Sequence, residues 1–112
     1  YDKFMHVIGS TAIAVIVYAV LEAYCRQRSP TLPWTLRAAT VFSVTLSSGV
    51  FWEFFEFGVD QTGFFYAQRG LTDTMMDLFA DGLGAVIAIL LFLPGKAPVP
   101  ALLSIKQRRT VL

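Results

Sequence analysis

The sequence contains few charged residues, a single cysteine and none of the short motifs that identify a common enzyme class. Only 15% of its 112 residues are charged, too few for a soluble domain of this size. The single Cys25 excludes a disulfide within the chain. No basic stretch with a small-residue cleavage site precedes the first hydrophobic run, so we expect no cleaved signal peptide. No Ser-His-Asp, Walker or His-Glu-x-x-His pattern supports a named reaction, which leaves open whether the protein is an enzyme.

Hydrophobic residues make up 55% of the chain, and its mean hydropathy is +0.60. They form three runs, each close to the roughly 20 residues that a helix needs to cross a bilayer. We therefore predict an all-α membrane protein with one membrane domain, residues 1–112, and three transmembrane helices at about residues 4–24, 36–59 and 73–93. Residues 96–112 are expected to form a basic tail on the membrane surface or to lead into a further segment.

Basic residues gather on one side of the predicted membrane. The opposite side carries only Lys3 and Arg69. The positive-inside rule then puts the N-terminus outside and the C-terminus in the cytoplasm, in a multi-pass protein of the inner (cytoplasmic) membrane with the lipid bilayer as its partner. Because these basic residues are ordinary cytoplasmic flanks, we expect no nucleic-acid partner. They are Arg26, Arg28 and Arg37 around the first loop and Lys96, Lys106, Arg108 and Arg109 in the tail.

Acidic residues gather on the other side of the predicted membrane. At the start of the third span, Asp73, Asp77 and Asp81 lie four residues apart, so a helix aligns them in one stripe. An ionisable side chain at membrane depth is costly, and it therefore indicates a functional site. The predicted topology brings acids from all three spans to one depth, together with His6: Asp2, Glu53, Glu56, Asp60, Asp73, Asp77 and Asp81.

So many carboxylates cannot all remain ionised together in a low-dielectric environment unless something neutralises them. A divalent metal ion is a candidate cofactor, and carboxylate oxygens with one imidazole suit Mg, Mn, Fe or Zn equally. Shared protons or a basic partner group would also neutralise the acids. The predicted metal ligands are Asp2, His6, Glu53, Glu56, Asp73 and Asp77.

Several polar and small residues are expected to have purely structural roles. Thr72 or Asp73 is expected to cap the third helix, and Glu22 to pair with Arg26 one turn later. The aromatic rings around Glu53 are expected to face lipid rather than to hold a cofactor. Small residues at four-residue spacing predict two faces for close helix packing: Ala39, Ser43 and Ser47 in the second span, and Ala80, Gly84 and Ala88 in the third.

The order of the polar motifs resembles that of a known family. The motifs are Asp2-Lys3-x-x-His6, Glu53-x-x-Glu56, and Asp73-Thr74-x-x-Asp77-Leu78 followed by Gly84-Ala85. As an ordered set they resemble the YjdF-like family of uncharacterised bacterial and archaeal inner-membrane proteins and, more distantly, the VanZ-like proteins. The resemblance covers nearly all of the three spans. It implies a polytopic membrane protein with these polar signature residues, and it supplies no agreed reaction.

The sequence leaves three functions open. We favour an accessory or structural subunit of a larger membrane complex, because helices with small-residue faces and short loops suit packing against other membrane protein subunits. The alternative is a membrane-embedded divalent-metal or proton site that serves transport or hydrolysis of a lipid-linked or small substrate. A lipid or pigment binder that uses the aromatic end of the second span is the third hypothesis.

Overall fold

The computed structural model describes residues 1–28 and 31–93, which fold into three α-helices. These are α1 (Asp2–Arg28), α2 (Trp34–Asp60) and α3 (Leu71–Phe92). Each helix is long and apolar enough to cross a membrane, which confirms the predicted all-helical class with three candidate spans. The helices end within a few residues of the predicted boundaries. The predicted basic tail, residues 96–112, lies outside the described residues.

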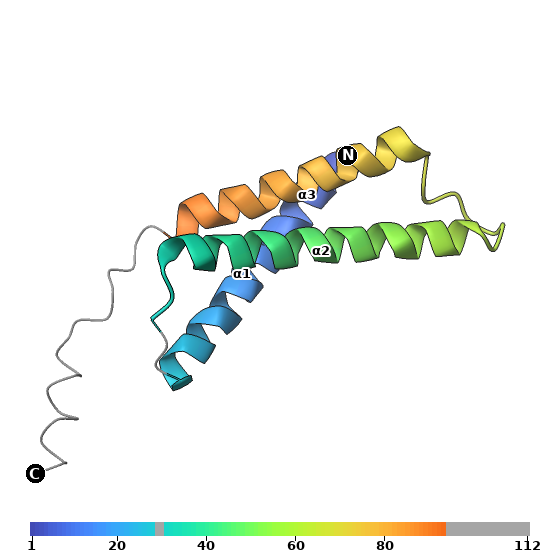
Figure 1. Ribbon diagram of the computed structural model, residues 1–112. Helices are drawn as coiled ribbons and strands as arrows, with labels where there is room; N and C mark the ends of the chain where they lie inside the picture. Colours follow the sequence, from blue (N-terminus) through green and yellow to red (C-terminus); the bar gives the residue numbers. More distant parts are fainter. Residues whose placement is uncertain (29–30, 94–112) are drawn as a thin grey trace, which may run out of the picture.

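The three helices form a small bundle in which α1 crosses the other two (Figure 1). The loop at residues 61–70 joins α2 to α3, and these two helices run back alongside each other from it. The packing of α1 is most extensive against α3. Because the first turns of α1 lie against the first half of α3, residues far apart in the sequence, such as Lys3 and Asp73, meet there.

Small residues allow α1 and α3 to approach closely. Gly84 of α3 lies against the backbone of α1, where an added Cβ would come within 2.6 Å of the Val7 carbonyl oxygen and 3.0 Å of the Thr11 nitrogen. The hydroxyl of Thr11 donates a hydrogen bond to the Gly84 carbonyl oxygen at 3.2 Å. Gly84 and Ala88 are buried, as the small-residue spacing in the third span predicts.

The small-residue row of α2 is not the face that packs within the described bundle. Ala39, Ser43 and Ser47 are exposed, so this row does not pack against α1 or α3. The buried face lies two positions further along the helix and consists of Val41, Thr45, Gly49 and Glu53. Both rows repeat every four residues, and the α3 side decides between them, because the Asp81 carboxylate occupies space that only a glycine at position 49 leaves free.

The apolar core lies at the end of the bundle where α1 is connected to α2. Its buried members are Ala14, Tyr18, Val41, Ala88, Ile89 and Leu93. Beside it, Glu22 of α1 forms an ion pair with Arg37 of α2. The expected pair of Glu22 with Arg26 is therefore wrong. The Arg37 guanidinium also lies 5.6 Å from the centre of the Tyr18 ring and 3.4 Å from its hydroxyl. The contact with Tyr18 helps to hold Arg37 beside Glu22, so Glu22 pairs with Arg37 of α2 and not with Arg26 of its own helix.

Side chains that face away from the bundle are largely apolar. Phe51, Phe54 and Phe55 are exposed on α2, as expected for rings that face lipid, and the loop carries exposed Phe64 and Tyr66. Because soluble proteins rarely expose so many large apolar side chains, this exposure fits a lipid environment.

Candidate functional site

The acidic stripe of α3 faces the first turns of α1. Asp77 and Asp81 are buried, with 2% and 5% of their side chains exposed, and Asp73 is 15% exposed. Four-residue spacing places all three on one side of α3. Each carboxylate contacts a basic side chain of α1, so the predicted stripe is the surface on which α1 and α3 exchange polar contacts.

Lys3 forms the contacts nearest the first turns of α1 and α3. Its Nζ lies 2.6 Å from Asp73 Oδ1, 2.7 Å from Asp77 Oδ1 and 3.5 Å from Asp2 Oδ2. It also lies 3.3 Å from the backbone carbonyl oxygen of Asp73. One ammonium group therefore neutralises carboxylates from both helices, and it remains partly open to its surroundings because 37% of the side chain is exposed.

His6 forms the contacts about one turn further along both helices. Its Nε2 lies 3.5 Å from Asp77 Oδ1, and its Nδ1 lies 3.2 Å from Asp81 Oδ1. Asp77 Oδ1 is thus shared by Lys3 and His6. Acidic and basic groups therefore alternate along the interface in the order Asp73, Lys3, Asp77, His6 and Asp81.

Three of the predicted metal ligands converge in this region. Asp2, His6 and Asp77 each offer one ligand atom, and these atoms lie within 4.8 Å of one another. Lys3 contacts two of the three residues, Asp2 and Asp77. A cation that enters here must therefore share these carboxylates with the lysine ammonium or displace it.

The acids of α2 lie in different surroundings from one another. Glu53 is only 4% exposed, and neither of its carboxylate oxygens has a hydrogen-bond partner among the described residues. The Glu56 carboxylate accepts a hydrogen bond of 2.8 Å from Trp52 Nε1. Asp60, which we expected in the cluster, accepts hydrogen bonds from the backbone nitrogens of Ala67 at 2.6 Å and Gln68 at 2.9 Å. Asp60 therefore stabilises the loop.

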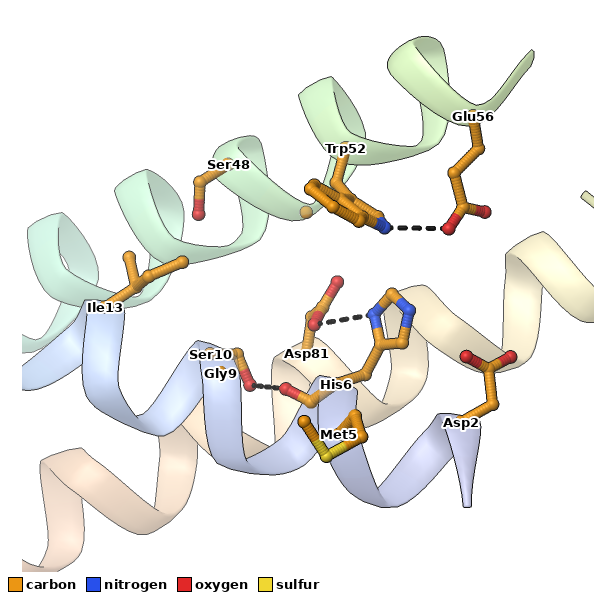
Figure 2. A pocket seen from close by; sticks show the side chains of 11 residues that line it. Asp2, Met5, His6, Gly9, Ser10, Ile13, Ser48, Trp52, Glu56 and Asp81 are labelled. Atoms are coloured by element: carbon orange, nitrogen blue, oxygen red, sulfur yellow. Dashed lines mark hydrogen bonds and ion pairs between the residues drawn. The ribbon is translucent and has the colours of Figure 1, made fainter. Parts of the chain in front are cut away.

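Figure 2 shows an open groove between α1 and α2 beside this cluster. Its volume is about 340 Å³. The carboxyl groups of Asp2, Glu56 and Asp81 line it together with the His6 ring, and its apolar surface includes Met5, Ile13 and Trp52. Asp81 rises from α3 between the two helices, so all three helices contribute to the groove.

The charges in this region do not balance. The acidic side chains are Asp2, Glu53, Glu56, Asp73, Asp77 and Asp81, against Lys3 and His6 as the basic side chains of the cluster. Burying an unpaired charge costs several kcal/mol by general estimates. Among the described residues, the carboxyl groups of this cluster, hereafter the acidic cluster, therefore outnumber the basic side chains that contact them.

Sequence reasoning missed two members of this arrangement. The sequence predicts Lys3 on the outer side without a partner, although Lys3 and His6 are three residues apart and so share a helix face. Asp81 was placed on the acidic stripe but omitted from the metal ligands. Four-residue spacing from Asp77 was the available signal, and the contact with His6 gives Asp81 its place in the site.

The predicted cap of the third helix is also wrong. Gly70 occupies the N-cap position with φ of 105°, a backbone conformation that favours glycine. Asp73 lies in the first turn instead, where its Oδ2 accepts a hydrogen bond of 3.3 Å from the Arg69 nitrogen and its Oδ1 contacts Lys3. Its carboxylate therefore serves both the helix start and the contact with α1.

Comparison with known proteins gives a family and no function. The sequence model of a family described as "Predicted membrane protein (DUF2238)" matches residues 1–95. An uncharacterised protein of Thermotoga maritima is 38% identical over 85 residues, which cover 75% of this chain and 43% of the relative. The chain thus matches less than half the length of that curated relative. No solved structure matches the sequence.

Proposed function

Since the chain belongs to the DUF2238 family of predicted membrane proteins, we propose that it forms a membrane-embedded site in which the acidic cluster binds a cation. The observation that carries this proposal is the convergence of Asp2, His6 and Asp77 from two helices, with ligand atoms within 4.8 Å of one another. Carboxylate and imidazole groups suit a divalent metal ion, and they also take up protons. The site would serve transport or hydrolysis of a small or lipid-linked substrate.

The six predicted metal ligands lie at different distances from the centre of the proposed site. Asp2, His6 and Asp77 form the centre of the site, and Asp73 contacts it through Lys3. Glu56 borders the adjoining groove, while Glu53 contributes a buried carboxylate without a hydrogen-bond partner among the described residues. We further propose that the cluster faces the extracytoplasmic side of the inner membrane, on the basis of the basic residues near the first loop.

The resemblance of the sequence motifs to the YjdF-like family is a further part of this proposal. We propose that the DUF2238 proteins correspond to the YjdF-like group, because Asp2, Lys3 and His6 of the opening motif contact Asp77 of the later motif or lie beside it. A signature whose members meet in space supports one shared site rather than separate structural roles.

The single histidine of the chain makes the proposal directly testable. Nitrogen NMR of the labelled imidazole, in purified protein freed of metal with a chelator, reports on His6 alone. We expect Zn²⁺ to shift its resonances saturably, with one equivalent of metal bound per chain by elemental analysis. If no metal binds, a pH titration of the same resonances in wild type and Asp77→Asn tests the proton form of the site.

A matched pair of variants separates a site from general surface charge. Asp77→Asn removes a central carboxylate, and we expect it to weaken Zn²⁺ binding by roughly tenfold or more. Asp60→Asn removes the same charge from the loop contact, and it should leave binding unchanged. Equal binding by both variants, together with a His6 titration that Asp77→Asn does not alter, would contradict the proposal.

A second function, an accessory subunit of a membrane complex, is favoured by one surface of α2. Ala39, Ser43 and Ser47 are exposed at a spacing that suits close approach of another helix. On this proposal, Ser43→Phe should release a partner protein that the Val44→Phe control retains, because Val44 is an exposed large apolar side chain already. Gentle extraction from native membranes followed by mass measurement distinguishes these results, and a wild-type chain that runs alone would count against a partner.

A further inference from the structure

We propose that the groove between α1 and α2 binds a small organic amine, whose ammonium group contacts Asp81 and whose apolar body lies against Trp52. This inference rests on the proposed function, because it names a class of substrate for the same acidic cluster. The groove shares Asp2 and His6 with the Asp2, His6 and Asp77 convergence, and it adds Asp81 and an apolar wall that the convergence does not use.

The Asp81 carboxylate is the first reason. Only 5% of its side chain is exposed, and its Oδ1 is held by His6 Nδ1 at 3.2 Å. Its other oxygen, Oδ2, has no hydrogen-bond partner among the described residues, although it is buried. Asp81 lines the groove, and Figure 2 shows its carboxylate between the α1 and α2 walls. A buried acceptor without a donor is costly, and a donor supplied by a ligand would satisfy it.

Gly49 is part of the same feature. A side chain at position 49 would collide with the Asp81 carboxylate, whose Cγ would lie 2.9 Å from an added Cβ. The absence of a side chain at Gly49, which also lines the groove, therefore gives Asp81 the space to reach this position. The free oxygen is thus held in place by His6 on one side and by the α2 backbone on the other.

The sign of charge in the groove selects the ligand. Asp2, Glu56 and Asp81 line it, whereas His6 is its one basic lining residue among the described part of the chain. Lys3 is not among the lining residues, so its ammonium does not occupy this space. Anionic ligands are therefore disfavoured, and a ligand ammonium group gains charge-assisted hydrogen bonds.

The remaining wall selects the ligand's body. Met5, Ile13 and Trp52 give the groove an apolar surface, and the Trp52 ring is held by its hydrogen bond to Glu56. The volume of about 340 Å³ falls at the small end of ligand pockets. A compact aromatic or aliphatic amine satisfies both the apolar wall and the free carboxylate oxygen, and an indole face also attracts cations.

Tryptophan fluorescence gives a direct test. The two tryptophans are Trp34, which begins α2, and Trp52, which lines the groove. In a Trp34→Phe background, emission comes from Trp52 alone. We would titrate the protein in detergent with 2-phenylethylamine and with 2-phenylethanol, a neutral compound of similar shape. We expect saturable change with the amine at roughly tenfold lower concentration than with the alcohol. Equal response to both compounds would overturn the proposal.

Two variants locate the binding. Asp81→Asn removes the charge, and it should weaken amine binding by roughly tenfold while leaving alcohol binding unchanged. Gly9→Leu adds a side chain to the α1 wall of the groove, at a position where an added Cβ meets no atom within 4 Å. It should block both compounds. Amine binding that survives Gly9→Leu in a helical protein would place the ligand elsewhere and overturn the proposal, even if Asp81→Asn fails to fold.

The same variants keep this inference separate from cation binding at the centre of the cluster. Zn²⁺ titration of Gly9→Leu, followed by the His6 resonances, should match that of the unmodified protein. Loss of amine binding with intact Zn²⁺ binding supports a distinct groove ligand. A protein that binds Zn²⁺ but never the amine refutes the amine proposal alone, whereas one that binds neither Zn²⁺ nor protons at His6 refutes the proposed function itself.

Discussion

The two ends of the bundle bury charge in different ways. At the end with the apolar core, Glu22 and Arg37 form one ion pair, with side chains 16% and 17% exposed, and Arg37 also contacts Tyr18. One acid meets one base, and the pair holds α1 against α2. At the other end, the acidic cluster gathers its carboxyl groups around Lys3 and His6. A balanced pair is explained by packing alone, whereas the excess of carboxyl groups at the other end is the basis for the proposed cation site.

Buried polar atoms without hydrogen-bond partners also differ between the two ends of the bundle. In the acidic cluster, both oxygens of Glu53 and Oδ2 of Asp81 lack hydrogen-bond partners among the described residues. Near the core, the Nε atom of Arg37 is without one, while its terminal nitrogen is paired with Glu22. The acceptors at one end outnumber the donors that the described residues supply there, and protons, a metal ion or a ligand would satisfy them.

The largest effect is expected where Gly84 of α3 lies against the backbone of α1, because that contact aligns the acidic stripe with Lys3 and His6. Gly84→Val would drive a side chain into the Val7 carbonyl and the Thr11 nitrogen of α1. Neither is the end of a flexible side chain, so we expect a loss of about 3 kcal/mol in stability. The measurement is reversible unfolding in mixed micelles, followed by circular dichroism.

Gly82→Val is the matched control on the same helix. An added Cβ at Gly82 meets only ring atoms of Phe42 at 3.9 Å, an ordinary contact. We expect its stability to remain close to that of the wild type. If the two valine variants unfold alike, then close approach of α1 and α3 at Gly84 is not what aligns the site.

Breaking the balanced end should cost less. Arg37→Met leaves the Glu22 carboxylate without its partner in a largely buried position, and we expect a loss of about 2 kcal/mol. The double variant Glu22→Leu/Arg37→Met removes both charges and should recover most of that loss. This recovery is the signature of a structural pair, measured by the same unfolding experiment as a double-mutant cycle. Losses that simply add would show that the pair is not coupled.

Much of the fold was predictable because membrane spans depend on length and hydrophobicity, which a sequence displays directly. The three helices and the acidic stripe of α3 follow from such regular spacing. The contact of Gly49 with Asp81 did not follow from spacing alone, since the exposed row of Ala39, Ser43 and Ser47 also repeats every four residues. The residue spacing within one helix does not reveal which of its faces a side chain from another helix will contact.

The polar contacts show the same limit. Sequence neighbours suggested that Glu22 pairs with Arg26, but α2 brings Arg37 to it across the bundle. Grouping the acids by membrane depth correctly brought Asp2, His6 and Asp77 together. It could not separate Asp60, whose oxygens accept hydrogen bonds from the following loop. Depth predicts which groups can meet, whereas the rotation of each helix and the path of each loop decide which groups do.

Removing the lysine sharpens the contrast between the two ends. Lys3→Met takes the ammonium away from Asp2, Asp73 and Asp77. Because Lys3 is 37% exposed, solvent screening limits the loss of stability to about 1 kcal/mol. In contrast, we expect Zn²⁺ affinity to rise roughly tenfold, since the variant lacks a tethered cation that competes for the same oxygens. Zn²⁺ titration of the His6 resonances measures this change.

Lys3→Arg provides the control for charge at that position. It keeps a positive group beside the carboxylates, so its Zn²⁺ affinity should remain close to that of the wild type. If Lys3→Met instead binds Zn²⁺ more weakly, then Lys3 helps to organise the ligands and does not compete with the metal. In that case the acidic end would resemble the Glu22 and Arg37 end, with charges that serve packing.

The smallest effect is expected at the glycine that makes room for Asp81. Gly49→Ala places a Cβ against the Asp81 carboxylate, which can move only by leaving His6 or the groove. We expect a loss of about 1 kcal/mol, partly offset by the better helix propensity of alanine. Gly58→Ala on the same helix meets no atom within 4 Å, so it should gain about 0.5 kcal/mol or slightly more. The opposite signs matter more than the sizes, because they isolate the Asp81 position from helix propensity.

Unfolding measured in the same micelles compares the two variants, and 2-phenylethylamine binding should weaken in Gly49→Ala alone. If Gly49→Ala is stabilised as much as Gly58→Ala, the Asp81 carboxylate is not held against α2, and its free oxygen is no longer an argument for a ligand at the acidic end.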